Sequence, residues 1–160
     1  MFDKFGEFDS VEELNEAAAG LIKAGKDNEV YELAKENGID HADVQDYMDG
    51  LEEEFVTPLM AAFGKLKVEA ESLGVDGILK DWTDSIMQMC SDDDALTVAV
   101  RKKGKTLTKC LGIILKNGFE IKKQIPDEVV KAAGLRSPLY LGIPNRKAVE
   151  DMVKAYYLGK

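Results

Sequence analysis

The chain has 160 residues, of which 45% are hydrophobic, and its formal net charge at pH 7 is −9. No stretch approaches the roughly 20 apolar residues of a membrane-spanning helix. The acidic, interrupted N-terminus MFDKFGEFDS lacks the pattern of a secretory signal. We therefore expect a cytoplasmic protein with no membrane segment.

The charge changes sign along the chain. Residues 1–100 carry 7 Lys against 25 Asp and Glu, a net charge of −18, and residues 101–160 carry 14 Lys and Arg against 5 acids, a net charge of +9. One domain of residues 1–160 is the default for this length, acidic over residues 1–100 and basic over residues 101–160, and two small helical lobes are the alternative.

Start and stop signals define the first two helices. Residues 10–13 read Ser-Val-Glu-Glu, a capping box that opens a helix, and Gly25 ends it. A second, short helix begins at Asp27 and ends at the Asn-Gly pair of residues 37–38.

The third predicted helix is capped by Asp40 and has two different faces. Its apolar residues recur at the helical period and predict a buried stripe of Val44, Tyr47, Met48, Leu51 and Phe55. The opposite, acidic face carries Asp43, Asp46, Asp49, Glu52 and Glu53. Acids spread over a helix can imitate the charge spacing of a nucleic-acid backbone, and such a face would be attracted to a basic protein cleft. We nominate these five residues as a partner-binding face, with a simple solvated face as the alternative.

Four more helices follow in the middle of the chain. Residues 57–58, Thr-Pro, predict the N-cap and first residue of a helix that ends at Gly74. The next helix opens at Asp76 and holds the single tryptophan, Trp82, which we interpret as a core anchor. The last two are predicted to be capped by Ser91 and Thr106, with Gly104 between them.

The C-terminal region is less regular. A short helix starts at Pro126 and ends near Gly134, residues 139–143 are extended or pair as a short strand, and Pro144 leads into the final helix. Strand signals are weak elsewhere. The predicted fold is all-α, a compact bundle of about eight short-to-medium helices with at most a short extended segment near 139–143.

The sequence contains no complete catalytic or metal-binding motif. Residues 104–106, Gly-Lys-Thr, match the end of a phosphate-binding loop, but residue 99 is Ala where that loop needs Gly, and a predicted helix precedes it. The aspartates that start at Asp40 lack the spacing of a calcium loop, and His41 is the only histidine. We expect neither an enzyme, nor a cofactor, nor a metal site.

The two cysteines, Cys90 and Cys110, lie among apolar residues at helical spacing. We expect reduced thiols in the core, and a disulfide between them is the alternative.

A basic segment spans residues 101–123, with eight Lys or Arg and one acid. Such a patch can hold phosphates, and its candidate nucleic-acid-binding residues are Arg101, Lys102, Lys103, Lys105 and Lys109. The competing interpretation is that these charges pair with a helix dipole and neutralise the acidic half of the chain.

Residues 102–111, KKGKTLTKCL, resemble the K-K-S-L-x-x-C motif of PcfK-like proteins, with Thr106 in the place of the serine. The chain is also similar to uncharacterised gut-Clostridia proteins that begin FDKFGEFDS and carry a late L-G-I-P, here residues 141–144. PcfK-like proteins are encoded on conjugative and integrative elements, and some are anti-CRISPR inhibitors of Cas9. The resemblance implies a mobile-element accessory protein.

Two functions follow as expectations. The first is a non-enzymatic protein that binds a protein partner through charge, most concretely an inhibitor of a Cas nuclease. The alternative is a DNA-binding or conjugation accessory module that uses residues 101–123. Neither the partner nor the oligomeric state can be read from the sequence.

Overall fold

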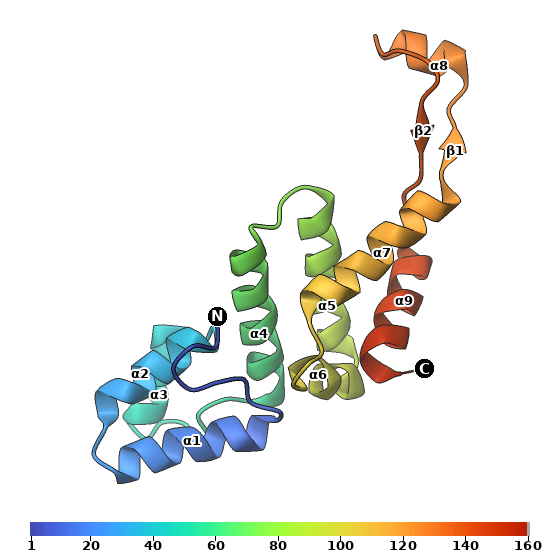
Figure 1. Ribbon diagram of the computed structural model, residues 1–160. Helices are drawn as coiled ribbons and strands as arrows, with labels where there is room; N and C mark the ends of the chain where they lie inside the picture. The colour runs from blue at the N-terminus through green and yellow to red at the C-terminus, as the bar shows by residue number, and fades with distance from the viewer. Residues whose placement is uncertain (160) are drawn as a thin grey trace.

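The structure is a computed structural model that describes residues 1–159, and over this range the fold is all-α, as predicted (Figure 1). The helices are α1 (Val11–Lys23), α2 (Asp27–Glu36), α3 (His41–Met48), α4 (Pro58–Leu73), α5 (Ile78–Asp92), α6 (Asp94–Arg101), α7 (Leu107–Ile121), α8 (Asp127–Ala132) and α9 (Arg146–Leu158). Two short strands, β1 (Lys123–Gln124) and β2 (Tyr140–Leu141), pair antiparallel, so the predicted extended segment near 139–143 is confirmed and has a partner that was not predicted.

The predicted N-caps at Ser10, Thr57 and Thr106 are confirmed. In each case the hydroxyl oxygen accepts a hydrogen bond from the backbone N–H three residues later, at 3.2–3.3 Å. Gly74 ends α4 in the left-handed conformation, with φ of 64°. These contacts are local, which explains why the sequence was sufficient to place them.

The predicted third helix is too long. Helix α3 ends at Met48, Gly50 follows with φ of 74°, and the backbone N–H of Leu51 closes the turn onto the Asp46 carbonyl at 2.9 Å. Leu51, expected in the buried stripe, is 72% exposed, whereas Phe55 is buried from an irregular segment outside the helix. The physical reason lies in the turn at Gly50 and in that irregular segment, where Asn15 exchanges two hydrogen bonds with the backbone of Val56.

The predicted cap at Ser91 is also wrong. Helix α5 continues to Asp92, and Ser91 lies inside it with its hydroxyl donating to the Met87 carbonyl. Asp93 caps α6 instead, because its carboxylate accepts from the backbone N–H of Leu96 at 3.1 Å. Three aspartates follow Ser91, and because α5 continues to Asp92, Asp93 is the residue between the two helices that can cap α6.

Buried apolar side chains form two clusters that meet at α4. One cluster is built from α1, α2, α3 and the start of α4, and the other from α4–α7 and α9, with Trp82 in it as predicted. At the junction Gly64 of α4 lies against the turn after α2, and a Cβ on Gly64 would be only 2.1 Å from the Asn37 carbonyl oxygen. A glycine at this position lets the two clusters approach through direct backbone contact.

An arm, residues 122–144, projects from this bundle. Figure 1 shows β1, α8 and β2 extending beyond the end of α7 and returning to α9. At the base of the arm the backbones of α7 and the returning chain touch, since a Cβ on Gly142 would be 2.1 Å from the Gly118 carbonyl oxygen. The arm therefore leaves the bundle from a closely packed base.

Cys90 and Cys110 are free and 1% exposed. Burial raises the pKa of Cys90 to about 11 and that of Cys110 to about 12. Since the thiolate is the reactive form, we expect a thiol reagent at neutral pH to label neither cysteine in the folded protein and both in denaturant. Rapid labelling of either one under native conditions would contradict their burial.

Candidate interaction surfaces

The five nominated acids form what we call the acidic surface: Asp43, Asp46, Asp49, Glu52 and Glu53. Asp43 and Asp46 lie on α3, and the other three lie on the segment that follows it. They therefore do not share one helical stripe as predicted. All are exposed except Asp43, which is half-buried and lines a cavity of about 260 Å³ with apolar side chains and Lys67 of α4.

The segment that carries the acidic surface contains no lysine or arginine. Residues 36–64 contain eight Asp or Glu and no Lys or Arg. Within the described residues none of the five acids forms an ion pair, whereas other exposed acids do, for example Asp84 with Lys80 at 2.5 Å. Negative charge that is fixed on a short helix and loop and forms no ion pairs produces a strong local field.

The candidate nucleic-acid-binding residues are not all exposed. Arg101 is buried. Its side chain is 2% exposed, and Nη2 donates to Oδ1 of Asn37 at 3.0 Å. The guanidinium lies over the Phe2 ring at 5.6 Å, and burial lowers its pKa. Arg101 therefore joins the two halves of the bundle and is not on the surface where a phosphate could reach it.

Lys105 is also engaged within the protein. Its Nζ donates to the carbonyl oxygen of Tyr156 at 2.7 Å and lies 5.0 Å from the centre of that ring. The side chains of Lys102, Lys103 and Lys109 are exposed, as expected of binding residues. Two of the five basic candidates thus hold the fold together and three remain on the surface.

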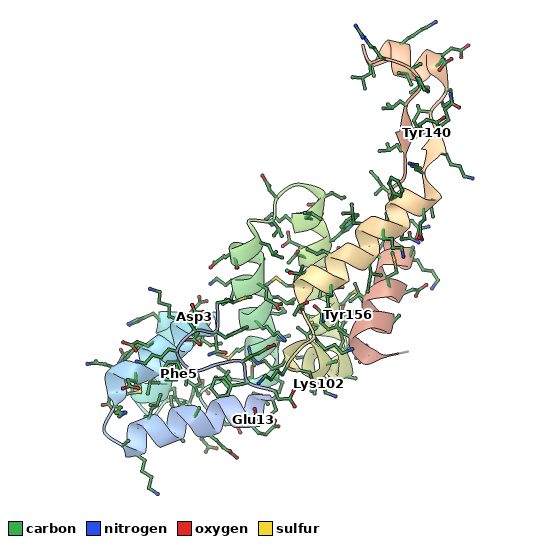
Figure 2. All side chains as sticks on the ribbon, viewed as in Figure 1. Asp3, Phe5, Glu13, Lys102, Tyr140 and Tyr156 are labelled. Atoms are coloured by element: carbon green, nitrogen blue, oxygen red, sulfur yellow. The ribbon has the colours of Figure 1, made fainter. Side chains whose placement is uncertain are left out.

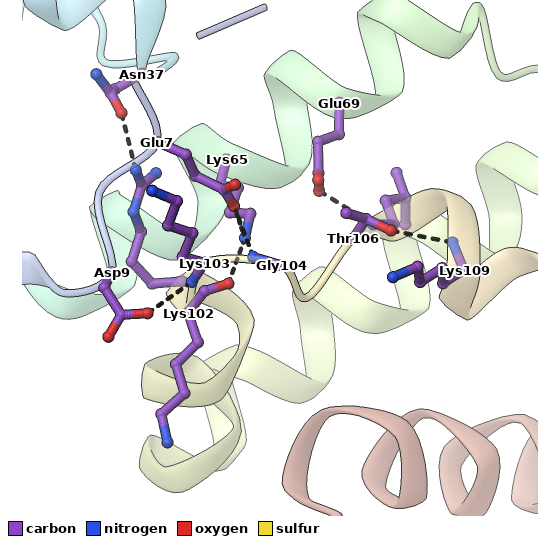
Figure 3. A network of polar contacts seen from close by, with 12 residues as sticks. Glu7, Asp9, Asn37, Lys65, Glu69, Lys102, Lys103, Gly104, Thr106 and Lys109 are labelled. Carbon is purple, nitrogen blue, oxygen red and sulfur yellow. Dashed lines mark hydrogen bonds and ion pairs between the residues drawn. The ribbon is translucent and has the colours of Figure 1, made fainter. Parts of the chain in front are cut away.

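A buried polar network surrounds the turn between α6 and α7, and no sequence signal predicted it (Figure 3). Lys65 of α4 is completely buried, and its Nζ contacts the Glu7 carboxylate at 2.8 Å and donates to the Lys102 carbonyl at 2.7 Å. One turn along α4, the Glu69 carboxylate accepts from the backbone N–H of Leu107 at 3.2 Å. Burial lowers the pKa of Lys65 and raises that of Glu69.

Glu7 belongs to an N-terminal strap, residues 2–9, that crosses both halves of the bundle. Near its start, the backbone N–H groups of Lys4 and Phe5 donate to Glu36 of α2 at 3.1 Å. Near its end, Asp9 accepts from the backbone N–H of Lys103 at 2.9 Å. Figure 2 shows Phe5 beside the first helices and Lys102 near the opposite end of the strap.

Exposed apolar residues are a further feature that the sequence analysis missed. Nine of the sixteen exposed large apolar side chains lie between residues 113 and 143, on α7 and the arm. They are Ile113, Leu115, Phe119, Ile121, Val129, Leu135, Tyr140, Leu141 and Ile143. The available signal was the apolar run of residues 139–143 outside any helix, which was interpreted only as a strand.

Comparison of the chain with family models, curated proteins and solved structures finds no match. Among residues 1–159 no helix combines the length and apolar character needed to cross a membrane. Over the same range no three His, Cys, Asp or Glu side chains gather in a way that could hold a metal ion.

Proposed function

We propose that the protein is a cytoplasmic, non-enzymatic binding protein that holds a basic region of another macromolecule against its acidic surface. The resemblance to PcfK-like proteins makes the proposal concrete, as a mobile-element protein that inhibits a Cas nuclease. The observation that carries the proposal is the unpaired state of the five acids in a segment without Lys or Arg.

Electrostatics explains how this surface would act. A basic cleft that binds nucleic acid attracts any rigid array of negative charges, which then competes with the natural ligand. Exposed charges are screened by salt, since the Debye length falls from about 10 Å at 0.1 M to about 3 Å at 1 M. Binding through the acidic surface must therefore weaken steeply as salt is added.

The alternative is a DNA-binding or conjugation accessory module that uses residues 101–123. The exposed Lys102, Lys103 and Lys109 support it. It is the weaker candidate because Arg101 and Lys105 have structural roles.

The test is a charge reversal of three exposed acids, Asp46→Lys, Asp49→Lys and Glu53→Lys. We expect binding to a Cas9–guide RNA complex to weaken by about 100-fold or more, since each reversal replaces an attraction worth about 1 kcal/mol with a repulsion. Calorimetry or competition with labelled target DNA measures the loss, and circular dichroism checks that the helices are intact.

The matched control reverses three exposed lysines, Lys102→Glu, Lys103→Glu and Lys109→Glu. Under the proposal this variant binds the nuclease as before. If it is the lysine variant that fails, and the wild-type chain binds free DNA in a salt-dependent way, the DNA-binding alternative is correct. If neither variant changes any binding, the charge asymmetry serves solubility alone.

A further inference from the structure

The cavity of about 260 Å³ that Asp43 borders lies where the two apolar clusters meet, and we call it the seam cavity. Its apolar lining comes from both clusters. Ile39 and Met60 belong to the cluster of α1–α3, and Phe63 and Met87 pack against the cluster of α4–α7 and α9. Ile39 is buried, whereas the other three side chains are half-buried. The seam cavity is therefore an apolar gap between two packed cores.

Backbone contact beside the seam cavity keeps it open. Gly38 and Gly64 both border it, and a Cβ on Gly38 would be only 2.3 Å from the Gly64 carbonyl oxygen. Because these two segments already touch, the turn after α2 cannot move closer to α4 and close the gap. An engineered apolar cavity of about 150 Å³ is large enough to bind benzene. The seam cavity can therefore accept an aromatic ring or a long aliphatic side chain.

The rim of the seam cavity carries three charged side chains, which leave one negative charge. Asp40 and Lys67 form an ion pair at 3.0 Å, so their charges compensate each other. Asp43 forms no ion pair within residues 1–159, and the next acid of the acidic surface, Asp46, follows one turn along α3. The uncompensated charge is thus on the side of the cavity where the acidic surface begins.

The apolar lining and the negative rim together define the occupant. Burial of apolar surface favours association, and methionine side chains adapt to occupants of different shape. A nucleic acid would bring its phosphates against Asp43 and the rest of the acidic surface and be repelled. A protein segment in which a Lys or Arg stands beside a large apolar residue matches both features.

We propose that the partner held by the acidic surface inserts one large apolar side chain into the seam cavity, beside a Lys or Arg that pairs with Asp43. This inference rests on the proposed function, since it specifies what the basic region of the partner must contain. The inserted side chain would contact both apolar clusters at once, and the acidic surface would hold the flanking positive charges.

The first experiment titrates the wild-type chain with two blocked peptides of equal charge, Lys-Lys-Phe-Lys-Lys and Lys-Lys-Ala-Lys-Lys, and follows both titrations by NMR. We expect the phenylalanine peptide to bind about 10-fold more tightly or better, the usual gain from burying one large apolar side chain. It alone should strongly shift the methyl resonances of Met60 and Met87, because its ring would lie against them. Both peptides should shift the amide resonance of Asp43.

The second experiment makes the lining polar without changing any charge. Met87→Gln retains a side chain of similar length, and burying a ring against its amide is unfavourable. The preference for the phenylalanine peptide should fall below about 3-fold, with the affinity for the alanine peptide unchanged. The matched control, Met152→Gln, alters a half-buried methionine of α9 outside the seam cavity and should leave the preference intact. Circular dichroism checks the fold of both variants.

The possible failures can be told apart. Equal affinity of the wild type for the two peptides, or a full preference in Met87→Gln, would overturn the seam cavity as the docking site and leave the role of the acidic surface intact. If neither peptide binds, the proposed function fails together with this inference. Sedimentation velocity tests a second copy of this chain as the occupant, since a wild-type dimer that the phenylalanine peptide dissociates would overturn the proposal in favour of self-association.

Discussion

Trp82→Ala is expected to lower the free energy of unfolding by about 3–5 kcal/mol, the usual cost of removing a large buried side chain. Trp82 is 7% exposed and belongs to the larger apolar cluster, where α5 packs against α4 and α9. The cavity left behind would be lined by side chains from several helices, which limits how far it can collapse. Urea unfolding, followed by circular dichroism because the variant has no tryptophan, gives the value.

The control for this substitution is Val98→Ala on α6, where the side chain is 52% exposed. It should change the stability by less than about 0.5 kcal/mol, as surface substitutions normally do. If Trp82→Ala lowers the free energy of unfolding by less than about 1 kcal/mol, the indole is not part of a packed core.

Glu7→Ala is expected to cost about 3 kcal/mol, although Glu7 lies outside every helix. Breaking a buried ion pair by removing one partner leaves the other charge uncompensated in a poorly solvated place. Here that charge is Lys65, whose Nζ would keep the hydrogen bond to the Lys102 carbonyl and the attraction of the Glu69 carboxylate, which forms no ion pair with it. The matched control is Asp84→Asn, which removes the carboxylate of the exposed pair with Lys80 and should have no measurable effect.

The cost of Glu7→Ala should decrease as the pH rises. Burial already lowers the pKa of Lys65 from 10.5, and loss of the neighbouring carboxylate lowers it further. At low pH both folded proteins hold a charged Lys65, and the variant pays the larger penalty. The difference is lost as the pH rises from the pKa of Lys65 in the folded variant to its pKa in the folded wild type, which lies below 10.5. The difference in unfolding free energy between variant and wild type should therefore be smaller near pH 10.5 than near pH 7. A constant difference would mean that Glu7 acts through packing and not through the charge of Lys65.

The elements that sequence reasoning placed correctly depend on neighbours within four residues. Hydroxyl caps such as Ser10 and Thr57 and the stop at Gly74 are local, so the sequence around them determines the structure. The predicted third helix was too long for a different reason. The apolar periodicity continued from Val44 to Phe55, but a contact between Asn15 and Val56, 41 residues apart, decides the course of the chain there.

The interaction surfaces show the same difference between features set by local sequence and features set by contacts between distant residues. The charge of the acidic surface could be read from composition, but its division between a helix and a loop could not. Arg101 shows a further limit, because a basic residue in the last turn of a helix has the same sequence pattern whether it faces solvent or Asn37, 64 residues away. The ion pair of Glu7 with Lys65 likewise depends on a contact between distant positions that no local pattern encodes.

The N-terminal strap also has a consequence for how the chain acquires its structure during synthesis. Residues 2–9 are synthesised before the groups they bind, since the backbone N–H groups of Lys103 and Gly104 are made almost a hundred residues later. Helices α1 to α3 can form and pack while translation continues, but the strap has no complete binding site until the turn after α6 has emerged. The strap is therefore fixed in place only after residues 10–104 have been made, and until then Lys65 lacks part of its set of partners.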